Sequence, residues 1–511
     1  MVMYGERHHH MGTKQRGQRA VAISAFDLPD YRRLLIHGCE DCACAVSVGE
    51  DHPATGPTLA GSAPDEPWVR GTGVYESALD GEHRLLFRPV GNGGVVVVNE
   101  SAYQVFRQFD GPVTLAGLRA RLRLAPGDID VVVDRLLQAC LIQSPGEVTS
   151  PSFGMPRTLT AWLHVSNACN LACPYCYVSK SAAGMDERAG LAAVDAVLGS
   201  AVAHGFAAVK LKYAGGEASL NKKLVLRLDS YARALAAERG LELHATLLSN
   251  GVALPQTFVD TLKAAGVRIM ISLDGVGHSH DIQRPSVTGK PSFRAVERTI
   301  SRLLAQRYPP HLSITVTSRN ASGIADAVRF ALDRGLTFSL NFFRDNECAS
   351  GFTDLRYTDE EMISGLSAAF DVIREQLPPW SVLGSILDRG QLLEPRQRPC
   401  GVGQDYVVID HEGGVAKCHM EIERTLGDVF RDDPLQLVRR DTRTVLNLLV
   451  DDKEGCRDCA WRYWCSGGCP VATFRATGRY DVKSPNCAIY KAIYPEALRL
   501  EGLRLLKYAP T

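Results

Sequence analysis

The chain has no excess of either charge and no long hydrophobic run. Its 511 residues include 57 basic and 57 acidic side chains, so the formal net charge is zero. A balanced charge gives no support for binding to nucleic acid. No stretch of about 18 apolar residues occurs, so no membrane span is predicted. No apolar segment of signal-peptide length follows residues 1–19, and the sequence therefore predicts a cytoplasmic protein.

The remaining composition is that of a globular protein with many cysteines. Hydrophobic residues make up 45% of the chain and charged residues 22%, which is ordinary for a folded soluble chain. The length predicts about three domains. The 15 cysteines suit a reducing compartment, where they stay reduced or bind iron. A disulfide framework is disfavoured because nothing marks the chain for secretion.

Three cysteines follow a short apolar run at residues 159–165, which predicts a buried strand. Cys169, Cys173 and Cys176 have spacings that allow three thiolates to bind three irons of a [4Fe–4S] cube. The fourth iron then has no protein ligand. A structural zinc site would need four ligands, and this loop offers three.

This C-x3-C-x2-C pattern, with Tyr175 before the third cysteine, resembles the cluster loop of the radical S-adenosylmethionine (SAM) enzymes. The resemblance implies that SAM binds the open iron through its amino and carboxylate groups. One electron from the cluster then yields a 5′-deoxyadenosyl radical, which abstracts hydrogen from the substrate. Tyr175 is implied to lie beside the adenine, although an aromatic residue there could instead shield the cluster from water.

Strand and helix patterns alternate after residue 158, which predicts a parallel sheet with right-handed crossovers. The fold class expected is α/β, a partial (β/α)6 TIM-like barrel, with its site at the carboxyl ends of the strands. The predicted strands are 159–165, 209–213, 244–248, 268–273, 311–317 and 337–343. The predicted helices lie near 186–203, 219–238, 255–265, 292–306 and 322–334.

Polar and small residues follow several of these strands. Small residues let the backbone approach a ligand, and a carboxylate can hold an ammonium group. The resemblance assigns contacts with SAM to Gly215, Gly216 and Glu217, although Ala218 departs from the family's proline. A plain strand-to-helix turn is the alternative.

Ser272, Asp274 and Arg284 are expected to bind SAM after the fourth strand. The alternatives are a helix cap for Asp274 and a surface ion pair for Arg284.

The N-terminal part contains a linker-like stretch and then a small module. Residues 51–73 are rich in Pro, Gly, Ala and Ser. Before them lie Cys39, Cys42 and Cys44. These cysteines either bind metal or form an oxidisable thiol pair, or they are incidental residues of a solvated loop. Strands at 84–90 and 94–98, a turn at 91–93 and three short helices follow. This order resembles the PqqD-like winged-helix module, which implies that a peptide leader is added as a strand at its sheet edge; a docking or structural module is the alternative.

Seven cysteines return after residue 385. Their order resembles the SPASM domain of peptide-modifying radical SAM enzymes, with zinc as the alternative. The resemblance assigns Cys456, Cys459, Cys465 and Cys487 to one auxiliary [4Fe–4S] cluster, and Cys400, Cys418 and Cys469 to another. Cys348 could supply a fourth ligand, or that iron could stay open. His419 replaces an aspartate base of sulfatase-maturating relatives and could itself accept a proton.

The sequence thus predicts a radical SAM enzyme that modifies a ribosomally made precursor peptide, for example by a thioether or a side-chain cross-link. It would use SAM, three [4Fe–4S] clusters and a flavodoxin- or ferredoxin-type reductant. The alternatives are a maturase of a folded protein and a non-catalytic metal-stabilised peptide-binding protein. The expected divisions are a poorly ordered segment with a linker at 1–80, the module at 81–145, a linker at 146–158, the barrel at 159–345, a bridging region at 346–395, the SPASM domain at 396–495 and a C-terminal helix or tail at 496–511.

Overall fold

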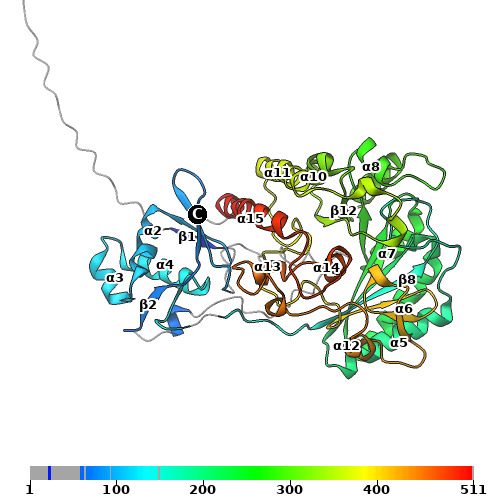
Figure 1. The fold of residues 1–511 in the computed structure, drawn as a ribbon, viewed down its shortest axis with the longest axis horizontal. Coiled ribbons are helices and arrows are strands. Elements are labelled where there is room, and N and C mark those ends of the chain that lie inside the picture. Colours follow the sequence, from blue (N-terminus) through cyan, green and yellow to red (C-terminus); the bar gives the residue numbers. More distant parts are fainter. Residues whose placement is uncertain (1–20, 25–57, 62–64, 92–93, 148–149, 509–511) are drawn as a thin grey trace, which may run out of the picture.

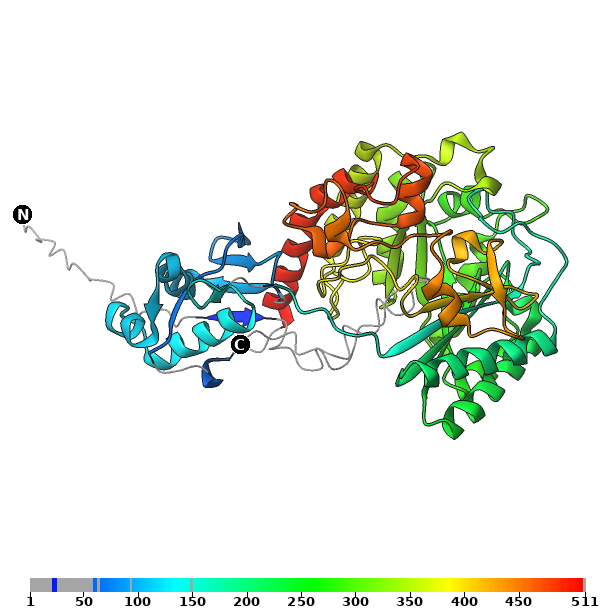
Figure 2. The same cartoon turned by 60° about the horizontal axis from the view of Figure 1, so that its bottom comes forward.

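The computed structural model describes residues 21–24, 58–61, 65–91, 94–147 and 150–508. The N-terminal module, in blue to cyan, lies at one end of an elongated molecule, and the green barrel lies at the other (Figures 1 and 2). The C-terminal helix, in red, lies between them. No helix in the described part of the chain is long and apolar enough to cross a membrane.

Six parallel strands, paired in chain order, form the sheet of the barrel. All six were predicted from their apolar runs. Their side chains are almost fully buried in β8 and β9, as expected of strands covered on both faces. The strands are β8 (Thr158–Ser166), β9 (Ala208–Gly215), β10 (Glu242–Ser249), β11 (Arg268–Ser272), β12 (His311–Val316) and β13 (Phe338–Phe342).

The crossovers between these strands are helical, as the apolar spacing predicted. On the five predicted helices, apolar positions three and four residues apart form a buried stripe. The short helix at residues 278–283 was not predicted and buries the polar His280 and Gln283. On α9 the buried stripe includes Val296, Ile300 and Leu303. The helices are α5 (Glu187–Ala203), α6 (Lys222–Glu238), α7 (Gln256–Ala264), α8 (His278–Gln283), α9 (Phe293–Ala305) and α10 (Ile324–Leu332).

The C-terminal region extends the same sheet. Two strands at Tyr406–Ile409 and Gly414–Ala416 form a hairpin, and the first of them also pairs in parallel with β8. The barrel sheet therefore stays open and its β8 edge is covered by β14 (Tyr406–Ile409), β15 (Gly414–Ala416) and β16 (Thr425–Asp428). Short helices follow: α12 (Pro434–Arg440), α13 (Arg462–Cys465) and α14 (Pro470–Thr477).

The N-terminal module contains more strands than its sequence predicts. Its main sheet has the order β1-β5-β4-β3, and a smaller sheet has the order β6-β2-β7. The strands are β1 (Ala22–Ser24), β2 (Pro67–Arg70), β3 (Tyr75–Ala78), β4 (His83–Phe87), β5 (Val96–Asn99), β6 (Val113–Thr114) and β7 (Ile142–Gln143). Because β2 and β3 pair with later strands, the expected boundary at residue 80 cuts through the module.

Three helices cover one face of the main sheet: α2 (Glu100–Arg107), α3 (Leu115–Arg121) and α4 (Pro126–Gln138). Asn99 accepts a hydrogen bond from the backbone N–H of Ala102 at 2.9 Å and so caps α2. Apolar residues of the helices and of one face of β4 and β5 share a core that contains Leu86, Val96 and Val98.

The other face of the module's sheet packs on the last helix of the chain. Helix α15 (Cys487–Tyr508) contacts β1, β4 and β5 and also α11 (Asp359–Glu375). Leu85, Phe87 and Val97 belong to the same apolar core as the barrel and α15. The Trp464 indole N–H donates to the Pro89 carbonyl at 2.6 Å, which joins the module to the cysteine-rich region.

Candidate functional site

The loop with Cys169, Cys173 and Cys176 leaves β8 at its carboxyl end. All three thiols are half-buried and not in disulfides. The Cys176 N–H donates to the Cys173 carbonyl at 3.1 Å, which turns the loop back on itself. The Leu171 N–H and the Asn250 amide approach the Cys169 Sγ, at 3.4 and 3.8 Å. The three thiols therefore lie at the strand ends, where the barrel's site was predicted.

Two glycines at the end of β9 let this loop approach closely. A Cβ on Gly216 would lie 2.5 Å from the Ala168 carbonyl oxygen, and one on Gly215 would collide with the Ser166 carbonyl oxygen. The Gly216 and Glu217 N–H groups donate to the carbonyls of Ser166 and Ala168, at 2.6 and 2.9 Å. A contact between the predicted Gly-Gly pair and the cysteine loop is thus a structural reason for both glycines.

A second segment holds the loop from the opposite side. The Ala172 N–H donates to the Pro285 carbonyl at 2.8 Å, and the Val287 N–H donates to the Asn170 carbonyl at 3.1 Å. Lys180 adds a third support, since its ammonium donates to the Leu171 carbonyl at 2.8 Å. An isolated lysine carries no sequence signal, and Lys180 was not predicted.

The Glu217 carboxylate is buried and joins two strand ends. It accepts hydrogen bonds from the Asn250 N–H at 2.6 Å, the Ser249 hydroxyl at 2.9 Å and the Ser219 N–H at 3.1 Å. The residue thus fixes the ends of β9 and β10 relative to each other. A contact between Glu217 and the amino group of SAM stays a prediction.

Tyr175, Asp274 and Arg284 meet below the cysteine loop. The Tyr175 hydroxyl donates to Asp274 and accepts from Arg284, and Arg284 also approaches Asp274 at 3.3 Å. Asp274 further accepts from the Thr315 N–H at 2.8 Å. Burial opposes the charge on Arg284, but Tyr175, Cys173 and Asp274 outweigh it and hold the pKa of this guanidinium above its usual value. The alternative of a surface ion pair for Arg284 is wrong, because the pair with Asp274 is buried.

Ser272 ends β11 and is half-buried. Its register partner is Ser313 of β12, whose hydroxyl accepts from the Asn341 amide of β13 at 3.1 Å. Polar side chains of three neighbouring strands thus follow one another across the sheet. Ser313 and Asn341 were not predicted, since a single polar residue inside an apolar strand has no distinctive pattern.

Burial and two nearby cations act in opposite directions on the thiols of the cysteine loop. Burial raises the pKa of Cys173 to about 11, while Arg284 and Lys180 oppose this shift. Burial also raises the pKa of Cys169. A thiol binds metal as the thiolate, so metal must displace these protons. Three thiols with two cations beside them fit a cube that takes one thiolate on each of three irons. Among the described residues, no three or more His, Cys, Asp or Glu could hold a single metal ion together.

Four later cysteines influence one another through charge. Burial raises the pKa of Cys456 to about 12, and the thiols of Cys465, Cys487 and Cys459 add to that shift. These are the four residues assigned to one auxiliary cluster. Their ligand role stays a prediction, but the chain brings them together.

The other three cysteines of this region, Cys400, Cys418 and Cys469, lie in one apolar cluster with Trp162 of β8. Lys453 is fully buried and lies between the two groups of thiols. Burial lowers its pKa, while Cys456, Cys400, Cys465 and Cys469 act in the opposite direction.

His419 follows Cys418 and is buried against the barrel. Its ring stacks on Trp162 with centroids 4.8 Å apart, and its Nδ1 lies 3.1 Å from the Tyr406 hydroxyl. Burial lowers the pKa of His419 well below its ordinary value, and nearby Arg389, Arg344 and Lys212 add to the shift. The ring is therefore neutral at pH 7. Its role as a base stays a prediction.

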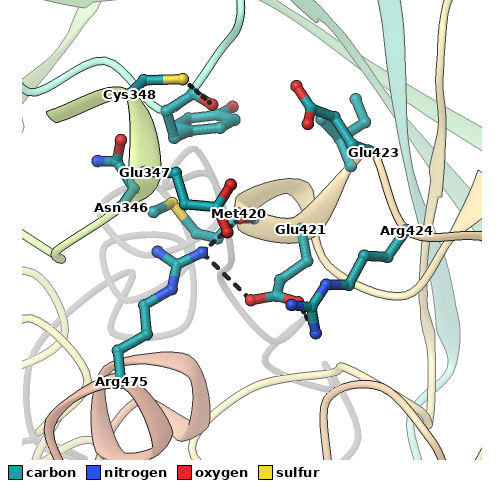
Figure 3. A pocket seen from close by; sticks show the side chains of 10 residues that line it. Asn346, Glu347, Cys348, Met420, Glu421, Glu423, Arg424 and Arg475 are labelled. Atoms are coloured by element: carbon teal, nitrogen blue, oxygen red, sulfur yellow. Dashed lines mark hydrogen bonds and ion pairs between the residues drawn. The ribbon is translucent and has the colours of Figure 1, made fainter. Parts of the chain in front are cut away.

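Cys348 is exposed and lies on a short helical turn at Glu347–Ala349 (Figure 3). Its thiol approaches the Tyr177 carbonyl at 3.6 Å. Burial raises the pKa of the Cys348 thiol, and Cys176 has the largest charge effect in the same direction. Cys348 lines a pocket together with Met420, Glu421 and Arg475. Its predicted role as a cluster ligand is not tested by these contacts. Cys39, Cys42 and Cys44 lie outside the described residues.

Comparison with known proteins identifies a matching family model and several related proteins. Residues 163–331 match the family model of the radical SAM superfamily. The chain is 28% identical over 289 residues to the sporulation killing factor maturation protein SkfB of Bacillus subtilis (strain 168), which covers 54% of this chain and 63% of SkfB. The chain thus spans less than two thirds of that relative.

A second relative is the PqqA peptide cyclase of Xanthomonas campestris pv. campestris (strain B100). It is 24% identical over 351 residues, covering 65% of this chain and 87% of the cyclase. Among solved structures, native anSMEcpe with bound AdoMet and the Cp18Cys peptide superposes with a TM-score of 0.56 at 19% identity, covering 68% of this chain and 99% of that one. This likeness supports the fold. Residues 163–331 therefore match the radical SAM superfamily, and the chain is similar in sequence to a killing factor maturation protein and to a peptide cyclase.

Proposed function

We propose that the chain modifies a ribosomally made precursor peptide by radical chemistry. The observation that carries the proposal is the loop with Cys169, Cys173 and Cys176, fixed on both sides at the carboxyl ends of the strands. A loop held by backbone hydrogen bonds on two sides keeps its thiols in one arrangement, which a preorganised metal site requires.

In this proposal Cys169, Cys173 and Cys176 would hold a [4Fe–4S] cluster as thiolates. With SAM bound, that cluster would supply a 5′-deoxyadenosyl radical for hydrogen abstraction from the substrate. Arg284 and Lys180 favour the thiolate forms of their neighbours. Tyr175 ties the loop to Asp274, so the loop keeps its position relative to β11. Contacts of SAM with Gly215, Gly216, Glu217 and Ser272 belong to the same proposal.

The substrate class rests on the relatives and on the N-terminal module. SkfB is named for maturation of a killing factor and the cyclase for its PqqA peptide. The four-stranded antiparallel sheet of the module suits a peptide leader that binds as an added strand. Binding the leader raises the local concentration of the rest of the peptide at the barrel. A thioether or a side-chain cross-link is the bond we propose.

Two auxiliary clusters complete the proposal. Cys456, Cys459, Cys465 and Cys487 would hold one, and Cys400, Cys418 and Cys469 the other, with Cys348 as a possible further ligand. A reductant of the flavodoxin or ferredoxin type would supply the electron that splits SAM.

Anaerobic reconstitution with iron and sulfide tests the proposal. Three cubes require about twelve irons per chain, and reduction should then release 5′-deoxyadenosine from SAM. Cys176→Ala should lower the iron to about eight per chain and abolish that release.

Cys140→Ala is the matched control, since Cys140 is buried in the N-terminal module and has no part in the proposed clusters. It should keep the full iron content and full SAM cleavage. Zinc in place of iron, or no 5′-deoxyadenosine from the reconstituted wild type, would rule the proposal out.

A further inference from the structure

The short strand β1 occupies one edge of the module's main sheet. Residues Ala22, Ile23 and Ser24 pair antiparallel with Val98, Val97 and Val96 of β5. The rest of that sheet is formed by residues 75–99, so this strand comes from a separate part of the chain. Figure 2 shows it in dark blue between the module's helices and the red helix α15.

The side chains of β1 alternate between two apolar cores. Ala22 is 9% exposed and packs in the core formed with α2 and α4, together with Val98. Ile23 packs on the opposite side, against the core that includes Val97 and α15. Successive side chains of a strand point to opposite faces, so each face of this edge accepts one kind of side chain. The face toward α2 and α4 accepts a small side chain, as in Ala22. The face toward α15 accepts a branched aliphatic side chain, as in Ile23.

The backbone of this segment is held at its other end by Asn99. The Val21 N–H donates to the Asn99 side-chain oxygen at 3.1 Å, and the Asn99 N–H donates to the Val21 carbonyl at 3.1 Å. The same side-chain oxygen caps α2. The edge of β5 therefore suits a strand, with an apolar core on each face and the Asn99 side chain at the end of the pairing.

We propose that β1 occupies, within the same chain, the sheet edge that binds a substrate leader. This rests on the proposed function of the module. The matching partner is an extended peptide with a small residue and a branched aliphatic residue in succession. A leader from another molecule must displace β1 before it binds, so the chain's own N-terminal segment competes with its substrate.

The size of this competition depends on the effective concentration of β1 at its own sheet edge. A strand covalently linked to its binding site has an effective concentration on the order of 1 mM. If the free peptide binds with a Kd of about 10 μM, the tethered copy weakens binding from solution by about 100-fold.

The test is the affinity of the full-length chain for a fluorescent peptide with the sequence of residues 17–30, measured by anisotropy. Ile23→Asp places a charge in an apolar pocket and should release β1, so the variant should bind the peptide at least about tenfold more tightly than wild type. Ala22→Arg should have the same effect from the helix side.

Val21→Asp is the matched control because its side chain is 37% exposed while the neighbouring pairing is kept. It should bind the peptide as weakly as wild type. Equal affinity of all four proteins, or no binding by the two variants with a released strand, would overturn the proposal. Amide exchange of residues 94–105 should rise in Ile23→Asp and fall again on addition of the peptide, which shows that the module is folded.

SAM cleavage without peptide is measured on the same samples. Its loss in wild type would contradict the proposed radical chemistry and leave the peptide-binding result intact. The two proposals can therefore fail separately.

Discussion

At the scale of single residues, the cysteines and the Gly-Gly-Glu sequence carried enough signal to locate the site. Their spacing is local, so it can be seen along the chain. The junction of Tyr175, Asp274 and Arg284 joins residues about a hundred positions apart, and no local pattern indicates that they touch. The sequence also assigned Gly216 to a ligand, whereas the structure gives it a contact with the cysteine loop.

Tyr175→Phe tests the hydroxyl at this junction. The variant removes the hydrogen bonds to Asp274 and Arg284 and leaves the buried pair of charges less satisfied. Losing a buried hydrogen bond to a charged group costs about 1–3 kcal/mol. We expect a lower Tm by thermal unfolding, with the iron content unchanged. A loss of iron as large as that of Cys176→Ala would show that the hydroxyl is needed to hold the cluster.

Asp405 predicts a pH dependence of stability. It is 2% exposed, and burial raises the pKa of its carboxyl to about 7, with Arg439 opposing. Between pH about 4 and 7 the unfolded chain loses this proton while the folded chain keeps it, so wild-type stability falls as pH rises. Asp405→Asn should remove this decrease in the free energy of unfolding, which is at most about 1.4 kcal/mol per pH unit. Urea unfolding at several pH values measures the difference between the two proteins.

The difference in free energy of unfolding between Asp405→Asn and wild type should grow from pH 4 to 7 and stay constant above pH 7. Asp371→Asn serves as the comparison, because its side chain is 60% exposed on α11. A constant difference between wild type and Asp405→Asn across the whole range would contradict the shifted pKa.

At the scale of elements, the barrel was the most predictable part of the molecule. Its strands are continuous apolar runs and its helices have a regular apolar spacing, so periodicity identifies both. Strands β2 and β3 were missed because they are short, and because β2 lies within and β3 just after residues 51–73, which are rich in Pro, Gly, Ala and Ser. The pairing of β14 with β8 joins segments about 250 residues apart, and sequence pattern does not give such a partner.

Gly216→Ala tests the contact between the end of β9 and the cysteine loop. The added Cβ would lie 2.5 Å from the Ala168 carbonyl oxygen, so the loop must move. We expect the loss of about four irons per chain, with the auxiliary clusters retained, by iron analysis and EPR spectroscopy. Gly199→Ala, within α5, is the control. Its added Cβ would lie 3.7 Å from the nearest neighbouring atom, which is an ordinary van der Waals distance. Alanine there should leave the iron content unchanged and stabilise the helix by about 0.5–1 kcal/mol.

At the scale of the whole molecule, the sequence predicted three folded parts but not how they meet. The module packs on α15 through the face of its sheet opposite its own helices. Both surfaces are apolar, and an apolar face does not specify its partner in sequence. Phe87 contacts Trp461 and Trp464, which lie among the later cysteines.

Trp464→Phe tests this junction. It removes the hydrogen bond from the indole to Pro89 and leaves a buried carbonyl without that donor, at a cost of about 1–3 kcal/mol. We expect faster amide exchange in β3 and β4, with exchange in β8 to β10 unchanged, as measured by mass spectrometry. Uniformly faster exchange in all these strands would indicate general destabilisation instead.

Helix α15 has one more consequence for how a peptide would be handled. The module packs on this helix through an apolar core, which holds β5 at a set distance from the cysteine loop. Under the proposed function, the reacting residue would be selected by its distance along the peptide from the docked strand, whatever its neighbours are.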